Sequence, residues 1–407
     1  MKLPKAPWQR GEGMKALLEA LGGRDGDTRY VGGCVRDTLL GLPVSDVDLA
    51  TRLPPQEVLE RLGKARIKAV PTGLAHGTIT AVVAGKPVEV TTLRRDVATD
   101  GRRATIAYTD DWREDAARRD FTINALLADP LTLLIHDYFG GEADLAARCV
   151  RFIGDPLTRI AEDHLRILRF FRFFARFGVG EPNAAALDAC TARANDLMAL
   201  SRERIADELT KLLALPEPVE AVRLMVGRSI LKPVLPEIGA DGIERLARLI
   251  ARESEAGIAP HPLRRLAALL PPDGDRAAAV AARLRLSNRA AKRLTSAAMR
   301  DEGDPRAPEA LAYQIGADEA VDRILLGEAD PKSAAPLVGW QRPRLRAGGG
   351  DLIAMGLEPG PVVARTLQAI EREWAEAGFP ADSAAQRAIA RRHVDQALRE
   401  SQRRAEE

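Results

Sequence analysis

Two carboxylates lie close together in a short apolar segment near the start of the chain. Asp46 and Asp48 alternate with Val47 and Leu49 within residues 44–49, a pattern that predicts a β-strand. Because alternate residues of a strand point to the same face, both carboxylates should project side by side. Adjacent negative charges are unfavourable without a cation, and carboxylate oxygens suit Mg²⁺. The spacing predicts a divalent-metal site occupied by Mg²⁺; the alternative is an exposed acidic strand end.

A pair of glycines precedes these acids, where a β-type run gives way to a helical one. Gly32 and Gly33 follow residues 29–31, and residues 35–40 have helical character before Gly41 ends them. Backbone N–H groups in such a turn can approach a triphosphate, and the helix dipole favours its negative charge. A phosphate cradle beside paired carboxylates indicates phosphoryl transfer with two metal ions. Taken alone, the glycines would form an ordinary turn.

The combined pattern GGCVRD…DVD resembles the first motif of the class II tRNA nucleotidyltransferases. This family of the polymerase β superfamily contains the CCA-adding enzymes and the bacterial poly(A) polymerases. The resemblance implies that Asp46 and Asp48 are catalytic and hold the metal. It also implies a third catalytic carboxylate at Glu89, on the strand just before TTLR, although that residue also fits an exposed strand glutamate. In the same motif it implies a nucleotide-binding set made of Gly32, Gly33 and Arg36.

A second polar cluster, RRDFTINA, runs from Arg118 to Ala125. Arginines near the metal can clamp a triphosphate and neutralise the charge that develops during transfer. A carboxylate at Asp120 can accept a hydrogen bond from a ribose hydroxyl. The segment closely matches the family's second motif, and the resemblance implies nucleotide-binding roles for Arg119, Asp120 and Asn124. The alternative is a strand entry with surface arginines.

Residues 94–108 are polar, rich in Arg and Asp, and without clear periodicity, which predicts a mobile loop. The resemblance places a flexible loop here, and its Asp100, Gly101 and Arg102 have a similar sequence in the family. Such a loop beside the site is a plausible lever for changing base preference between successive additions. We therefore expect a complete CCA-adding enzyme; the alternative is a solvated hairpin tip.

The sequence EDHLR begins a stretch with helical apolar periodicity that ends at Gly178. On one helix, Asp163 and Arg166 share a face and Glu162 can orient Arg166. A carboxylate that accepts beside a guanidinium that donates matches the edges of cytosine and adenine. Uracil and guanine would leave polar groups unpaired, at a cost of about 1–3 kcal/mol each. EDxxR is the family's fourth motif, so these three residues are predicted to bind the base; a solvated helical ion pair is the alternative.

Composition limits the remaining possibilities. The chain has 407 residues, 29% of them charged, and a formal net charge of +2, so any RNA site must be a local patch. Three scattered cysteines predict a reducing compartment without a disulfide framework or zinc site. We see neither a signal peptide nor a transmembrane run, and we expect a cytoplasmic protein with no membrane or protein partner.

The order of elements predicts an α+β protein: a small mixed-sheet nucleotidyltransferase head at the N-terminus, then an all-α neck, body and tail. We place the catalytic head at residues 1–150, the neck at 151–215, the body at 216–304 and the tail at 305–407. The neck would select the base, and Ser201–Leu209 within it resembles the family's fifth, structural motif. The tail would contact tRNA, with a Gly-rich turn at residues 349–361 behind Arg342, Arg344 and Arg346.

Taken together, the motifs predict template-independent addition of C, C and A to tRNA 3′ ends from CTP and ATP, with release of pyrophosphate. One alternative is a poly(A) polymerase with the same head. An alternative of another class is a non-catalytic RNA-binding protein on this fold.

Overall fold

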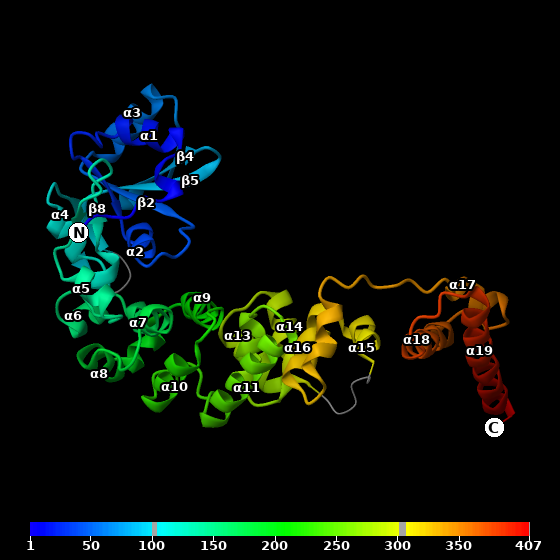
Figure 1. Cartoon of the computed structure of the whole chain (residues 1–407). Coiled ribbons are helices and arrows are strands. Elements are labelled where there is room, and N and C mark those ends of the chain that lie inside the picture. The colour runs from blue at the N-terminus through cyan, green and yellow to red at the C-terminus, as the bar shows by residue number, and fades with distance from the viewer. Residues whose placement is uncertain (100–103, 301–306, 407) are drawn as a thin grey trace. The chain divides into compact units, whose positions relative to one another are not determined.

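The computed structural model describes residues 1–99, 104–300 and 307–406. The chain divides into two compact units, Met1–Val234 and Leu235–Glu407. The first holds all the strands described and the second is helical (Figure 1). The predicted α+β class, with a mixed-sheet head followed by helices, is confirmed. The four-part division predicted above is finer than these two units and stays a prediction.

A seven-stranded sheet forms the centre of the head, in the order β3-β4-β5-β2-β1-β8-β9. Within it β2 pairs parallel with β5, and the neighbouring pairs β1–β2 and β4–β5 are antiparallel, so the sheet is mixed. The β4–β5 hairpin turns at Ala84 and Gly85, both with positive φ. The strands are β1 Thr28–Val31, β2 Val47–Thr51, β3 Lys68–Gly73, β4 Thr78–Val83, β5 Lys86–Thr92, β8 Leu127–Ala128 and β9 Ile135–His136.

Amphipathic helices cover part of this sheet. Helices α1 and α3 pack on each other and on β4, and Leu17 and Leu62, one from each helix, are completely buried. Helix α1 begins only at Glu12, because Pro4, Pro7 and Gly11 interrupt the segment before it. The helices of the head are α1 Glu12–Ala20, α2 Gly33–Leu39, α3 Pro55–Lys64, α4 Trp112–Ala117 and α5 Gly141–Ala146, with 3₁₀ turns η1 Pro7–Gln9, η2 Leu74–His76 and η3 Thr122–Asn124.

The segment predicted as a loop over residues 94–108 contains two strands. Strand β6, Arg94–Thr99, pairs antiparallel with β7, Ala104–Tyr108, in a two-stranded sheet of its own. The pairing has a register shift between Asp96 and Ala98, which interrupts the regular alternation that identifies a strand in a sequence. Asp100, Gly101 and Arg102 lie outside the described residues.

Five helices and a 3₁₀ turn follow the head within the first unit. Helix α7, Leu165–Phe177, buries an aromatic face that includes Phe170 and Phe171. Phe121 of the head lies 5.1 Å from Phe173 of this helix between ring centroids, so the predicted neck packs directly on the head. The other elements are α6 Pro156–Glu162, α8 Ala184–Ala192, η4 Ala194–Ala199, α9 Arg202–Leu213 and α10 Val219–Gly227.

The second unit contains two buried groups of side chains. In the first, Arg264 donates to Glu253 at 2.7 Å and to Asp322 at 2.8 Å, and all three are almost completely buried. In the second, Trp374 and Ile370 pack within an apolar cluster. The helices of the second unit are α11 Ala240–Ala256, α12 Pro262–Leu269, α13 Gly274–Arg283, α14 Asn288–Ala298, α15 Pro308–Ile315, α16 Ala317–Leu326, α17 Gly349–Ala354, α18 Pro361–Glu376 and α19 Ser383–Glu406, with the 3₁₀ turn η5 Pro331–Leu337.

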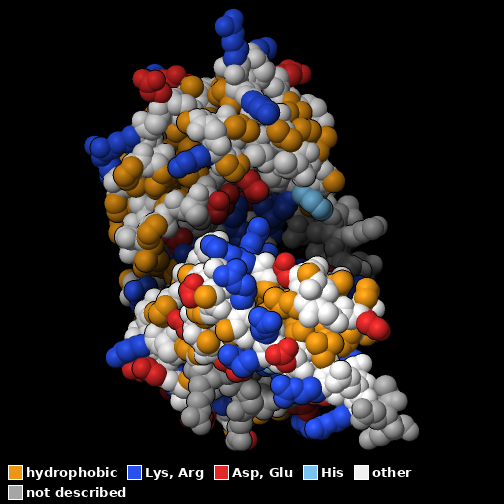
Figure 2. All heavy atoms as spheres, turned by 90° about the vertical axis from the view of Figure 1, so that its right-hand side faces the viewer, with side chains coloured by type: hydrophobic (Ala, Val, Ile, Leu, Met, Phe, Trp, Pro, Cys, Tyr) orange, Lys and Arg blue, Asp and Glu red, His pale blue; other side chains and the backbone are white. Residues whose placement is uncertain are grey.

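Acidic, basic and apolar side chains are interspersed on the face drawn in Figure 2, as the near-balanced charge of the sequence leads one to expect. Among the helices of the described ranges, none combines the length and apolar character needed to cross a membrane.

Candidate active site

The glycine turn joins β1 directly to α2, as the sequence predicts. Gly32 caps α2 with φ 69°, a conformation that side-chain-bearing residues rarely adopt. A Cβ atom at Gly32 would lie 3.5 Å from Arg119 Nη1 and 3.5 Å from the Asn124 carbonyl oxygen. The second motif therefore lies against the first, and glycine is needed for both conformation and space.

Two carboxylates lie on neighbouring strands, and a third lies in the segment just before one of them. Strand β2 begins at Val47, so Asp48 lies on it and Asp46 in the segment just before. Asp48 pairs in register with Glu89 on the parallel strand β5. Burial, then repulsion from Glu89 and Asp46, raises the pKa of Asp48 to about 6, while Arg119 opposes the shift. Glu89 is exposed, so its side chain is accessible to a ligand.

The donor set suits a hard divalent cation, since carboxylate oxygens on adjacent strands repel one another until a cation lies between them. Within the part of the chain that the structure describes, however, no group of three His, Cys, Asp or Glu side chains is close enough to hold a metal ion.

A buried aspartate organises the two arginines of the second motif. Asp115 on α4 is 1% exposed and accepts from Arg118 Nε at 2.9 Å and Nη2 at 2.8 Å. Its other oxygen accepts from Arg119 Nη2 at 3.2 Å. The backbone N–H of Arg94, the first residue of β6, also donates to Asp115 at 3.2 Å. Asp115 thus links Arg119 to the root of the β6–β7 hairpin.

Sequence reasoning missed Asp115, although its spacing from both arginines was a usable signal. Positions i+3 and i+4 on a helical turn are neighbours, so an acid there pairs with Arg118 and Arg119. Burial alone would raise the pKa of Asp115, but the charges of Arg119 and Arg118 outweigh it and hold that pKa below its usual range.

Three other predicted nucleotide-binding residues form a buried network. Arg36 is 5% exposed and donates to Asp37 and to Asn124. Asn124 in turn donates to Asp120 Oδ1 at 3.0 Å. The second oxygen of Asp120 accepts from Arg169 of α7 at 2.7 and 2.5 Å. Asp120 therefore ties the head to α7, and both its oxygens are engaged within the protein.

The predicted base-binding residues do not lie on one continuous helix. Helix α6 ends at Glu162, and Asp163 is extended, with φ −152° and ψ 105°. Helix α7 begins at Leu165, whose N–H donates to Asp163 Oδ1 at 3.1 Å. The expectation of a shared helical face for Asp163 and Arg166 is therefore wrong, because an aspartate that accepts a nearby backbone N–H competes with the helix. The apolar periodicity of the sequence continues across this break because both α6 and α7 bury apolar residues.

The other contacts of this motif follow the prediction more closely. Arg166 Nη1 donates to Glu162 at 2.5 Å, so Glu162 does orient Arg166. Arg166 Nη2 donates to the Arg118 carbonyl oxygen at 3.1 Å. The predicted base site is thereby joined to the second motif, which itself abuts the glycine turn.

Two residues of α9 were interpreted from sequence only as structural support. Arg204 Nη2 donates to both oxygens of Asp163, at 3.0 and 2.8 Å. Glu208, 3% exposed, accepts from Arg172 Nε at 2.6 Å and lies 3.8 Å from Arg169. Forty-one residues separate Arg204 from Asp163, and no local pattern in the sequence signals such a pair.

Comparison with known proteins places these motifs in a family. The family described as "Poly A polymerase head domain" matches residues 28–151, and one described as "Probable RNA and SrmB- binding site of polymerase A" matches residues 183–241. The mouse protein named CCA tRNA nucleotidyltransferase 1, mitochondrial, is 33% identical over 405 residues, covering 93% of this chain and 90% of its own. A Geobacillus thermodenitrificans CCA-adding enzyme is 35% identical over 271 residues, 64% of each chain.

The fold has a matching solved structure. A Bacillus stearothermophilus CCA-adding enzyme in complex with CTP superposes with a TM-score of 0.74 at 26% identity, over 95% of this chain and 98% of its own. Similarity to the mouse relative along nearly the whole length of both proteins shows that this chain belongs to the class II CCA-adding enzyme and poly(A) polymerase family.

Proposed function

We propose that this protein is a template-independent tRNA nucleotidyltransferase that adds C, C and A to tRNA 3′ ends from CTP and ATP, releasing pyrophosphate. Relatives along most of the chain carry names of this activity. The observation that supports it most directly is the continuous path of contacts in the first unit. Gly32 abuts Arg119, and the adjacent Arg118 accepts through its carbonyl oxygen from Arg166. One bound nucleotide can span that path from its phosphates to its base.

Asp46 and Asp48, with Glu89 beside them, are the groups proposed to hold divalent cations, and we propose Mg²⁺. When bound there, the cations would supply positive charge that stabilises the attacking and leaving oxygens. Arg119 would bind the triphosphate, and the N–H groups after Gly32 would face its oxygens. The carboxylates would position the tRNA 3′-hydroxyl for attack on the α-phosphate.

Asp163 and Arg166 are proposed to select the base. An accepting carboxylate beside a donating guanidinium pairs with the amino group and ring nitrogen of cytosine or adenine, while uracil and guanine present the opposite pattern. Glu162 fixes Arg166 and Arg204 fixes Asp163, so both partners are oriented before the base arrives. Pre-orientation reduces the entropy lost on binding.

Asp120 and Asn124 are proposed to act on the nucleotide from within the network that joins the head to α7. Since Asp120 already accepts from Arg169 and Asn124, a ribose contact would require exchange of one of those hydrogen bonds. Arg36, buried against Phe177 at 4.2 Å from its ring centroid, would support the same wall.

The segment of residues 94–108, which includes Asp100, Gly101 and Arg102, is proposed to help switch the site from C to A addition. The segment begins at Arg94, which is bonded to Asp115 and so to Arg119. Replacing residues 94–108 with a short Gly-Ser linker should leave two C additions nearly normal and strongly reduce A addition. Equal loss of all three additions would contradict this role.

The second unit is proposed to contact tRNA, partly through Arg342, Arg344 and Arg346, which are exposed ahead of α17. We also propose a cytoplasmic location on the basis of the cysteine content, although the mouse relative is named mitochondrial.

Incubation with tRNA lacking its CCA end, Mg²⁺ and labelled nucleotides tests the proposed activity. Addition of two C residues from CTP, then one A when ATP is present, is the expected result. Long A tails on any RNA would instead indicate a poly(A) polymerase. Binding of tRNA without incorporation would indicate a non-catalytic RNA-binding protein.

A further inference from the structure

Four arginines surround a small cavity in the second unit, far along the chain from the catalytic motifs. The cavity has a volume of about 190 Å³. Arg245, Arg248 and Arg252 lie at positions i, i+3 and i+7 of α11, a spacing that places them on one helix face. The fourth, Arg300, follows α14. Apolar side chains complete the wall: Leu249, Pro272, Leu325 and Leu326.

Two of these arginines also fix helix ends. Arg245 Nε donates to the Ala268 carbonyl oxygen at 2.8 Å, at the end of α12. Arg252 Nε donates to the Leu325 carbonyl oxygen at 2.9 Å, at the end of α16. Cations bond favourably to these terminal carbonyls. The contacts position both guanidinium groups but do not neutralise their charge.

The charges of the other two arginines are only weakly compensated by nearby acidic side chains. Arg248 Nη1 lies 3.6 Å from Glu328, whose side chain is 92% exposed, and such an exposed ion pair contributes little to stability. Glu328 is the only acid among the described residues that line the cavity. Burial, then the charges of Arg245 and Arg248, lowers the pKa of Arg300. Its Nη1 atom is buried and has no hydrogen-bond partner among the described residues.

A buried donor without a hydrogen-bond partner is costly, and an anion would supply that partner.

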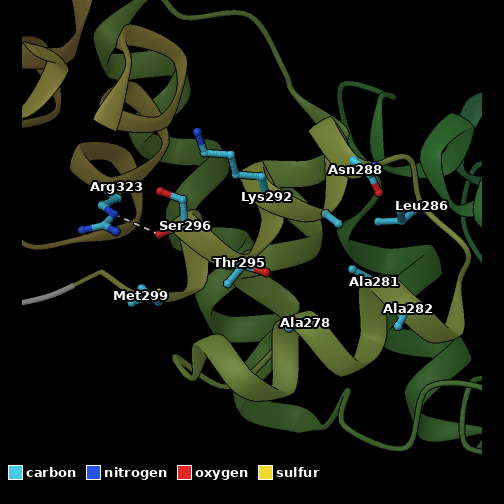
Figure 3. Close-up of a pocket in the computed structure, with 11 residues that line it drawn as sticks. Ala278, Ala281, Ala282, Leu286, Asn288, Lys292, Thr295, Ser296, Met299 and Arg323 are labelled. Carbon is cyan, nitrogen blue, oxygen red and sulfur yellow. Dashed lines mark hydrogen bonds between the residues drawn. The ribbon is translucent and has the colours of Figure 1, made fainter. Parts of the chain in front are cut away.

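A neighbouring cavity of the same unit does not gather arginines in this way. That cavity, of about 480 Å³ among α13, α14 and α16, is lined largely by small side chains such as Ala278, Ala281 and Ala282 (Figure 3). Its arginine, Arg323, is already bonded through Nε to the Ser296 carbonyl oxygen at 2.9 Å.

We propose that the cavity between α11 and Arg300 binds a phosphate group. The guanidinium fork matches the oxygens of a phosphate, and several forks around one cavity neutralise its full charge. The phosphate comes either from the backbone of the RNA that the proposed function requires or from free phosphate in solution. In the first case the site anchors the RNA away from the catalytic residues, without reading its sequence.

Binding of tRNA lacking its CCA end, measured by fluorescence anisotropy at several salt concentrations, tests the RNA source. The variants are Arg300→Met, which keeps an apolar stem, and Arg248→Gln at an exposed position. A matched control is Arg276→Gln, since Arg276 is 60% exposed and pairs with Asp273 in the same unit. Each test variant should bind about tenfold more weakly, and the slope of log K against log salt should fall by about one, while the control is unchanged.

Thermal melting with inorganic phosphate at matched ionic strength tests the free source. The wild-type protein should melt at a higher temperature in phosphate than in chloride, and Arg300→Met should lose that difference. A melting response without any change in RNA affinity would assign the site to free phosphate. The proposal is overturned if both test variants keep the RNA affinity of the wild-type protein and are stabilised by phosphate as much as it is.

Two further readouts keep the result unambiguous. In chloride, Arg300→Met should melt at or above the wild-type temperature, because an uncompensated buried charge is removed. A large drop would mean that Arg300 is structural, which also overturns the proposal. Nucleotide addition by the wild-type protein reports the proposed function separately, so its failure is distinguishable from failure of the phosphate site.

Discussion

Asp115→Asn should weaken catalysis without touching a group that contacts the substrate. The carboxylate is 1% exposed and accepts four hydrogen bonds, three from the guanidinium groups of Arg118 and Arg119 and one from the Arg94 N–H. An asparagine keeps one carbonyl oxygen and turns an amide NH₂ toward the other donors. At least one charge-assisted bond is lost, and Arg119, bonded only at 3.2 Å, is the first to be released.

The size of the effect follows from that single bond. A hydrogen bond to a charged group contributes about 1.5–3 kcal/mol, which corresponds to a fall of roughly 10- to 150-fold in kcat/KM if Arg119 binds the triphosphate. The loss should appear for CTP and ATP alike, with a raised KM for both nucleotides. The KM for tRNA and the preference for CTP over UTP should not change, because Asp163 and Arg166 are untouched.

Steady-state kinetics with each nucleotide varied at saturating tRNA measures these parameters. The control is Asp111→Ala, which removes the N-cap contact to Arg113 on the same helix and costs about 1 kcal/mol of stability while leaving both arginines paired. Assays run well below both melting temperatures. If Asp115→Asn retains more than about a third of wild-type kcat/KM, or loses no more than Asp111→Ala, Asp115 does not position the triphosphate arginines.

Three further outcomes are expected. Asp48→Ala should abolish addition of every nucleotide while tRNA affinity in a filter-binding assay stays near wild type; more than about a tenth of wild-type kcat, roughly 1.4 kcal/mol of barrier, would exclude a catalytic role. Arg204→Met should free Asp163 and narrow the preference for CTP over UTP in kcat/KM several-fold, and an unchanged ratio would leave Arg204 with a purely structural role. Burial would raise the pKa of Asp120, but Arg169 and hydrogen bonds outweigh it and lower that pKa. Its contribution to stability is therefore present above the unfolded pKa of about 3.9 and lost as pH falls through the folded value. Urea unfolding should show a deficit for Asp120→Asn at pH 7 that shrinks toward pH 3, and a deficit independent of pH would contradict this.

Local chemistry explains why much of the fold and the site was predictable from the sequence. Gly32 needs a positive φ, and the strand that carries Asp48 has an apolar alternation that a short window reveals. The β4–β5 hairpin, the helical second half and the class of the fold follow from signals of the same range. Each depends on residues only a few positions apart, which interact whatever the tertiary structure.

Other features were decided by contacts that no local window contains. Asp163 leaves the helix because its carboxylate accepts a nearby N–H and is held by Arg204 from α9. Both oxygens of Asp120 are engaged because Arg169 approaches from α7, 49 residues away. Arg300 becomes part of a candidate phosphate site only because the fold places it beside the arginines of α11. Sequence patterns determine which chemical groups a segment carries. The tertiary structure decides which distant segments pack against it, and therefore which of these groups are buried and which charges are neutralised.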